Sequence, residues 1–145
     1  MRRGKGEEEK LAICAVREIY AELARRPQER ACTHRTECCR FQLTGKTPHL
    51  TKGEAMVAAQ AWKSTGRKSL PERADGACPL LHPESSRCLI YASRPFGCRT
   101  HFCAAAGGLA PRRDVADLIR RLEAVSLGLG SREARPIADA LRACL

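Results

Sequence analysis

Aromatic residues are scarce in this sequence, which holds one Trp, two Tyr and three Phe among its 145 residues. Large aromatic side chains bury the most area per residue. A core with so few of them must therefore rely on Leu, Val and Ala, or on something other than burial. The length fits one domain of ordinary size, so we expect residues 1–145 to form a single domain.

Long apolar runs are also missing. No segment approaches the roughly 20 apolar residues that cross a membrane. The basic pair Arg2–Arg3 is followed by Glu7, Glu8 and Glu9 rather than by the apolar stretch of a secretory signal. We therefore expect a cytoplasmic protein without a membrane partner. Disulfides need an oxidising compartment, and nine cysteines is an odd number, so a disulfide framework is disfavoured.

Motifs of the common enzyme and nucleic-acid-binding classes are absent. The sequence contains no C-x-x-C and neither of the usual ferredoxin spacings. It has no nucleophile–base arrangement, phosphate loop or cofactor fingerprint, which leaves its status as an enzyme open. No recognised nucleic-acid motif appears either.

The two ends of the chain are predicted to be helical. Residues 7–26 begin with glutamates and end with Arg25 and Arg26, as the helix dipole favours, and Pro27 follows. Leu11, Ala15, Ile19 and Leu23 form the predicted apolar stripe. Near the other end, Pro111 suits a first helical residue. That helix should end at Gly128 and Gly130, with Ser131 capping a last one.

A further helix is predicted to begin at Thr51. Thr51 and Glu54 form a capping-box pattern, and Gly66 marks the end. Capping is the simpler role for Glu54. Trp62 on this helix, like Tyr91 further on, is interpreted as a core residue.

Cysteine is the residue in excess, and seven of the nine cysteines lie in two groups within residues that lack helical periodicity. The seven are Cys32, Cys38, Cys39, Cys78, Cys88, Cys98 and Cys103. Thiolates bind soft or borderline metals, which favours zinc, iron or an iron–sulfur cluster such as [4Fe-4S]. Tetrahedral sites often draw ligands from two distant segments, so a metal would fold the two groups onto each other.

The other candidates around the cysteines have two interpretations each. His34 or His101 would supply a further ligand or remain on the surface. Arg94 and Arg99 would bind an anion, or offset thiolate charge and bond backbone carbonyls. Cys14 and Cys144 lie on predicted helices and are interpreted as small apolar core residues. The fold expected from these patterns is mainly α, with terminal helices around an irregular, metal-organised, cysteine-rich core.

Residues 31–104 resemble a known family, the YkgJ-like cysteine cluster (CxxCxxCC) proteins. The stretch RCLIYASRPFGCR, from Arg87 to Arg99, is similar to the family signature C-x-I-Y-x-x-R-P-x-x-C-R, and GACPLL at 76–81 is similar to the element before it. Cys32, Cys38 and Cys39 match three cysteines of the family's name motif. Arg35 stands where the remaining one would be, so His34 or other positions would complete the ligands.

The resemblance implies a region at residues 31–104 that chelates zinc or iron. A related cysteine module in the flagellin lysine methylase is associated with an iron–sulfur cluster, which favours iron. The leading hypothesis is a structural or carrier metal centre, which predicts stoichiometric metal and unfolding when it is removed. One alternative is a component of a metal-dependent protein-modifying or redox enzyme, with a protein partner. Another is a basic zinc module that binds nucleic acid unspecifically, which the net charge of +10 favours.

Overall fold

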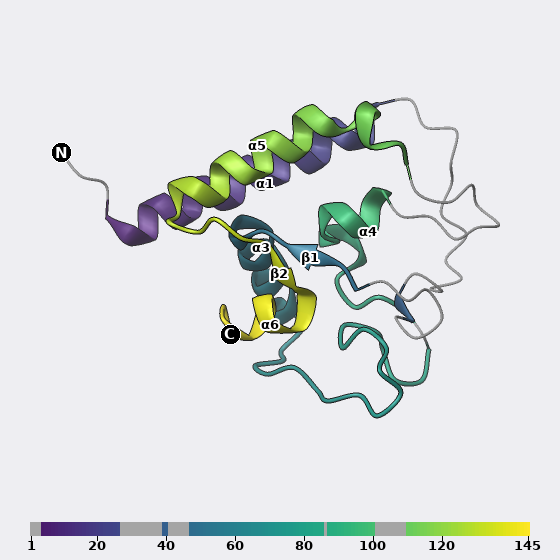
Figure 1. Cartoon of the computed structure of the whole chain (residues 1–145). Coiled ribbons are helices and arrows are strands. Elements are labelled where there is room, and N and C mark those ends of the chain that lie inside the picture. The colour runs from purple at the N-terminus through teal and green to yellow at the C-terminus, as the bar shows by residue number, and fades with distance from the viewer. Residues whose placement is uncertain (1–3, 27–38, 41–46, 86, 101–109) are drawn as a thin grey trace.

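The computed structural model of the chain describes residues 4–26, 39–40, 47–85, 87–100 and 110–145. Within these residues the chain is mainly α-helical, with one two-stranded antiparallel sheet, which confirms the predicted fold class (Figure 1). None of the described helices is long and apolar enough to cross a membrane. The elements in chain order are α1 (Lys5–Arg25), β1 (His49–Leu50), α3 (Lys52–Ser64), the 3-10 turn η2 (Tyr91–Ser93), α4 (Phe96–Thr100), the 3-10 turn η4 (Arg112–Asp114), α5 (Ala116–Gly128), β2 (Arg135–Pro136) and α6 (Ile137–Arg142).

Helix α1 matches the predicted helix closely, but its buried face shares only Ile19 and Leu23 with the predicted stripe. Glutamates occupy its first turn and Arg25 its last, as the dipole argument requires. The predicted stripe is partly wrong, because Leu11 is 45% exposed. The buried face consists of Ala12, Val16, Ile19, Tyr20 and Leu23.

Helix α3 is the central element of the fold, since it contacts α1, α5 and α6. Its start confirms the predicted capping box between Thr51 and Glu54. Its end agrees with the prediction at Gly66, which adopts a φ of 86° that suits glycine. The small side chains of Ala55, Ala58 and Ala59 on α3 let neighbouring segments approach closely. Trp62, near the end of the same helix, is 1% exposed.

Two apolar clusters pack on different faces of α3. The first, here called the helical cluster, joins α1, α3, α4 and α5. Its buried members are Val16, Ile19, Tyr20, Leu23, Val57, Phe96, Val115, Leu118 and Leu122. Figure 1 shows α1 and α5 side by side and running in opposite directions.

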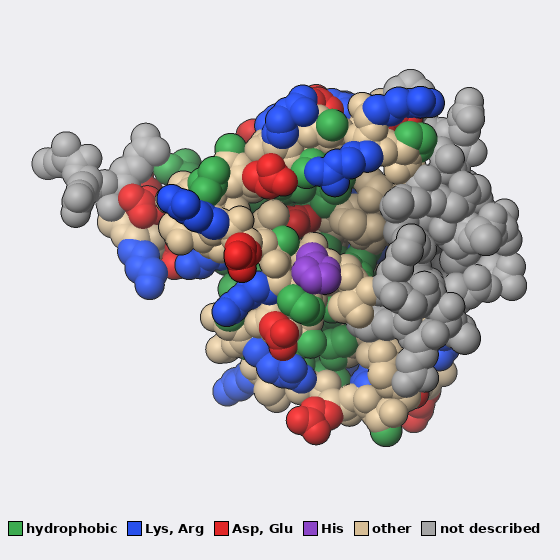
Figure 2. Space-filling view, in the orientation of Figure 1, with side chains coloured by type: hydrophobic (Ala, Val, Ile, Leu, Met, Phe, Trp, Pro, Cys, Tyr) green, Lys and Arg blue, Asp and Glu red, His purple; other side chains and the backbone are tan. Residues whose placement is uncertain are grey.

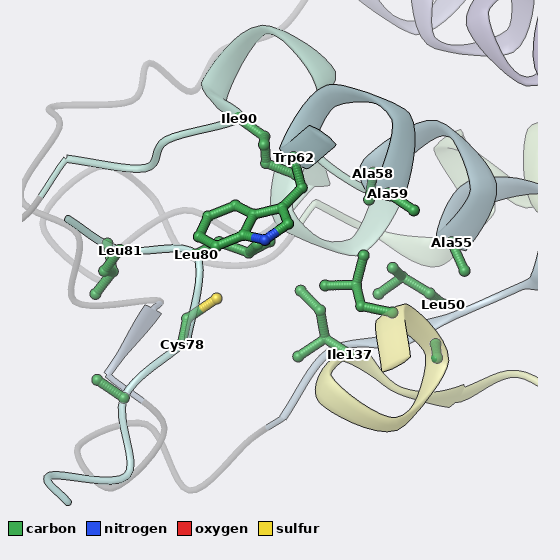
Figure 3. Packing of buried hydrophobic residues seen from close by; sticks show 13 residues of the cluster. Leu50, Ala55, Ala58, Ala59, Trp62, Cys78, Leu80, Leu81, Ile90 and Ile137 are labelled. Carbon is green, nitrogen blue, oxygen red and sulfur yellow. The ribbon is translucent and has the colours of Figure 1, made fainter. Parts of the chain in front are cut away.

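The second cluster, here called the Trp62 cluster, lies on the other face of α3 (Figure 3). It gathers side chains from α3, α6, β1 and the irregular segment 77–90. Its buried members are Leu50, Ala55, Ala58, Ala59, Trp62, Ala77, Cys78, Leu80, Leu81, Ile90, Ile137, Ala140 and Leu141. The described part of the irregular region is therefore ordered by apolar burial, a contribution that the sequence interpretation left out.

The C-terminal elements differ in detail from the prediction. Pro111 precedes the 3-10 turn η4, and α5 begins only at Ala116. Gly128 and the left-handed Gly130 end α5 as expected. Ser131 does not cap the last helix, because residues 135–136 first pair with β1, with Pro136 opposite His49, and Pro136 is the N-cap of α6.

We expect Gly53→Ala to destabilise the fold, because Gly53 lies where α3 meets α1 and α5. A Cβ there would stand 2.9 Å from Val16 Cγ2 and 3.0 Å from Val125 Cγ1. Overpacking of this kind costs about 1–3 kcal/mol, which denaturant unfolding measures. Gly128→Ala on α5 is the matched control, since a Cβ there meets nothing within 4 Å. Equal stability of the two variants would contradict this packing.

Candidate metal centre

Four of the seven predicted ligands lie in the described residues. Cys39, Cys88 and Cys98 are half-buried, and Cys78 is buried. The other three, Cys32, Cys38 and Cys103, lie outside the described residues, as do His34 and His101.

The two cysteine groups meet at the Trp62 cluster. The backbone N–H of Cys78 donates to the carbonyl of Cys39 over 2.8 Å, so the first group contacts the second directly. Leu81, three residues after Cys78, lies opposite Cys88 in an antiparallel bridge. Cys39 and Cys88 both pack against the cluster. The predicted approach of the two groups is confirmed for these residues.

The side chain of Cys78 is the most enclosed of the four. It is 5% exposed, and in Figure 3 it points toward the side of the cluster where Trp62 lies. In this arrangement Cys78 also acts as a small apolar core residue.

The described residues alone form no complete site. Among them, no three Cys, His, Asp or Glu side chains lie close enough together to hold a metal ion.

Arg73 is a cation beside the cysteines that the sequence interpretation missed. Its guanidinium donates to both carboxylate oxygens of Asp75 over 2.9 and 2.7 Å, and to the carbonyl of Leu81 over 3.2 Å. The hydrogen bond to Asp75 is the main cause that raises the pKa of Arg73, and the charge of Cys78 adds to it. Arg73 lies three positions before Gly76, where the GACPLL element begins. No local motif would have identified it except its pairing with Asp75 in R-x-D.

Helix α4 carries Cys98 and follows from the local sequence around Pro95. The carbonyl of Pro95 accepts the N–H groups of Cys98 and Arg99, both over 3.1 Å, and the fixed φ of proline suits a helix start. Arg99 reaches back to the chain before the helix, with Nε donating to the carbonyl of Arg94 over 2.7 Å and Nη2 to that of Ala92 over 2.9 Å. The predicted bonding of backbone carbonyls by this arginine is confirmed.

A buried carboxylate fixes the start of α4. Glu54 is 3% exposed, and its Oε1 accepts the N–H of Phe96 over 2.7 Å and the hydroxyl of Tyr20 over 3.1 Å. Its Oε2 accepts the N–H and the hydroxyl of Thr51 over 3.1 and 3.0 Å. Glu54 therefore does more than cap α3, because it links α1, α3 and α4 at one point.

Tyr20 extends this network toward Cys98. The guanidinium of Arg99 lies over the Tyr20 ring, 4.3 Å from its centre. Burial is the main cause that raises the pKa of Tyr20 well above 10.0, and the neighbouring charges of Glu54 and Cys98 raise it further. Neither Tyr20 nor its contact with Arg99 was predicted, since the two residues are far apart in the sequence.

Four residues predicted to lie in the core differ in their burial. The prediction that Cys14 packs in the core is wrong, because Cys14 is exposed on α1. Cys144 is half-buried and packs against the Trp62 cluster, as predicted, and burial raises the pKa of its thiol. Trp62 is a core residue, but Tyr91 is 37% exposed and lies beneath the guanidinium of Arg94.

A pocket of about 550 Å³ lies against α4, on the side of Gly97 and Thr100. Its other walls come from α5, β1 and the loop at 132–134, and Figure 2 shows the surface hollowed there. On the described part of the face in Figure 2, basic and acidic side chains are interspersed rather than separated into a basic patch.

Comparison with known proteins assigns the cysteine region. A sequence model described as "CxxCxxCC: Putative zinc- or iron-chelating domain" matches residues 30–118, more than half of the chain. The chain belongs to the CxxCxxCC family. The match contains all seven central cysteines and ends within α5, and it leaves out Cys14 and Cys144. The searches of curated proteins and of solved structures found no match to this CxxCxxCC protein.

We expect Glu54→Gln to destabilise the protein. The amide keeps one acceptor oxygen but turns an NH2 group toward donors, which leaves buried donors without a partner. The expected loss is about 1–3 kcal/mol in the free energy of unfolding, measured with denaturant. Tyr20→Phe removes only one of the donors and should cost less. A Glu54→Gln variant as stable as the wild type would contradict this network.

Proposed function

We propose that this chain binds zinc or iron at a centre built where the two cysteine groups meet, in a structural or carrier role. The observation that carries the proposal is the direct contact between Cys39 and Cys78, which lie far apart in the sequence but join through a 2.8 Å backbone hydrogen bond. The family is described as zinc- or iron-chelating, which supports metal binding in general.

The proposed ligands come from the seven central cysteines, namely Cys32, Cys38, Cys39, Cys78, Cys88, Cys98 and Cys103. Thiolates are suited to zinc and to iron–sulfur clusters. Among the described residues, no three Cys, His, Asp or Glu side chains lie close enough together to hold a metal ion. We therefore propose that the rest of the coordination comes from residues 27–38 and 101–109. These segments contain three cysteines together with His34 and His101.

The charges around the centre support a bound thiolate cluster. A metal held by four thiolates carries a net negative charge of about −2 for Zn²⁺. Arg73 and Arg99 both interact electrostatically with a described cysteine, Cys78 and Cys98 respectively. These arginines offset the net negative charge that remains on the thiolates after the metal is bound.

Metal analysis tests the proposal. Protein purified without oxygen and without a metal-binding tag should contain about one or two zinc ions, or about four iron and four sulfide for a cubane cluster, per chain. Cys88→Ser should lower the amount of bound metal. Cys14→Ser should not, because Cys14 is exposed on α1 and lies outside the family match. A metal-free protein with paired cysteines would contradict the proposal.

The sequence predicted that the protein unfolds when its metal is removed, but the fold now leads us to expect that a chelator leaves the helical scaffold folded. The helical cluster joins α1, α3 and α5 through side chains that include no cysteine among its described members. We therefore expect circular dichroism to retain most of the helical signal, while proteolysis of the cysteine-bearing segments accelerates. Complete loss of helix on chelation would show that the metal holds the whole fold, as zinc does in small zinc fingers.

A second candidate function is a component of a metal-dependent redox or protein-modifying enzyme, with the pocket beside α4 as the place for an outside ligand. Gly97 and Thr100 of α4 line this pocket, and Cys98 lies between them in the chain but is not one of its lining residues. A catalytic metal needs a position open to an outside ligand. If the centre is catalytic, imidazole added to the Co²⁺-loaded protein should shift the cobalt absorption. An unchanged spectrum favours the structural role.

A further inference from the structure

Arg99 differs from an ordinary surface arginine in how firmly it is held. Two of its nitrogens donate to the carbonyls of Ala92 and Arg94, over 2.9 and 2.7 Å. Its guanidinium also stacks on the Tyr20 ring, with 4.3 Å to the ring centre. These three contacts restrict the guanidinium to one position, although a free arginine side chain populates many rotamers.

The platform beneath Arg99 is itself fixed. Tyr20 is 4% exposed, and its hydroxyl donates to the buried carboxylate of Glu54 over 3.1 Å. A phenol that donates to a carboxylate gains electron density, and an electron-rich ring attracts a cation more strongly. The position of Arg99 therefore depends on α1 and α3 as well as on α4.

Cys98 is the residue directly before Arg99 on α4. The backbone N–H groups of both residues donate to the carbonyl of Pro95 over 3.1 Å. The hydrogen bonds of the Arg99 side chain to the carbonyls of Ala92 and Arg94 therefore tie the chain before α4 to the turn that carries Cys98.

We propose that Arg99 is a positioning residue for the metal centre, because its side chain braces the turn that presents Cys98 against the segment before α4. The inference rests on the proposed function, because it requires Cys98 to be a ligand. It assigns a role to the arginine that follows the cysteine in R-P-x-x-C-R. Residues outside the ligand set that orient a ligand typically change metal affinity by about 10–100-fold.

Arg94 offers a matched control in the same segment. Its guanidinium lies over the Tyr91 ring, 3.9 Å from the centre, and donates to the carbonyl of Tyr91 over 3.0 Å. Arg94→Gln removes one positive charge from the protein, as Arg99→Gln does, but keeps the backbone carbonyl that Arg99 contacts. The pair of variants separates a local effect on Cys98 from a general effect of net charge.

The experiment titrates the metal-free full-length protein with Co²⁺ and then with competing Zn²⁺. The thiolate-to-cobalt charge-transfer absorption reports both the affinity and the number of bound thiolates. We expect Arg99→Gln to weaken affinity about 10–100-fold with the full absorption at saturation, and Arg94→Gln to stay close to the wild type. Arg99→Lys keeps the charge but loses the fork geometry, so its affinity should be intermediate.

The outcomes distinguish this inference from the proposed function. If Cys98→Ser lowers the absorption and weakens binding while Arg99→Gln binds as the wild type does, the role of Arg99 is refuted and the centre stands. If Cys98→Ser changes nothing, Cys98 is no ligand and the inference fails alone. A wild-type protein that binds neither metal overturns both. Circular dichroism of each metal-free variant checks folding, and an Arg99→Gln effect seen only in an unfolded protein also refutes the positioning role.

Discussion

The buried carboxylate of Glu54 is the interaction on which the rest of the structure depends. A buried charge without partners costs several kcal/mol, so its donors must be held in place. Those donors come from the hydroxyl of Tyr20 on α1, the first amide of α4 at Phe96, and Thr51 at the start of α3 itself. The hydrogen bonds to this one carboxylate thus determine how α1, α3 and α4 pack together. They also fix the turn that carries Cys98.

The same residue illustrates what could be predicted from the sequence. Its local role was visible, because Thr51 and Glu54 lie three residues apart in a capping pattern. Its long-range partners, 34 and 42 residues away, leave no local signal. The buried face of α1 was predicted only in part for a similar reason. Periodicity allowed Leu11 or Ala12 to begin the buried stripe, and contacts with α3, such as the close approach of Gly53 to Val16, decide for the latter.

The cysteine region was predictable in composition but not in geometry. Spacing and family resemblance predicted a chelating region, and the family is now assigned. The contact between Cys39 and Cys78 could be expected, because metal sites often take their ligands from two distant segments. The apolar anchoring of residues 77–90 on Trp62 did not follow, because Leu80, Leu81 and Ile90 show no periodicity and acquire their shared face only through the folded chain.

The helices and the cysteine-bearing segments are stabilised by different contacts. Helices α1, α3 and α5 pack through the helical cluster, whose described members include no cysteine. The cysteine-bearing segments attach to this scaffold at the Trp62 cluster and through α4, where Glu54, Tyr20 and Arg99 meet. A metal bound by these segments would therefore act on a scaffold that is already in place. The ordering entropy it must overcome is that of the cysteine segments alone, and its affinity should be sensitive to any change at the Glu54–Tyr20–Arg99 contact.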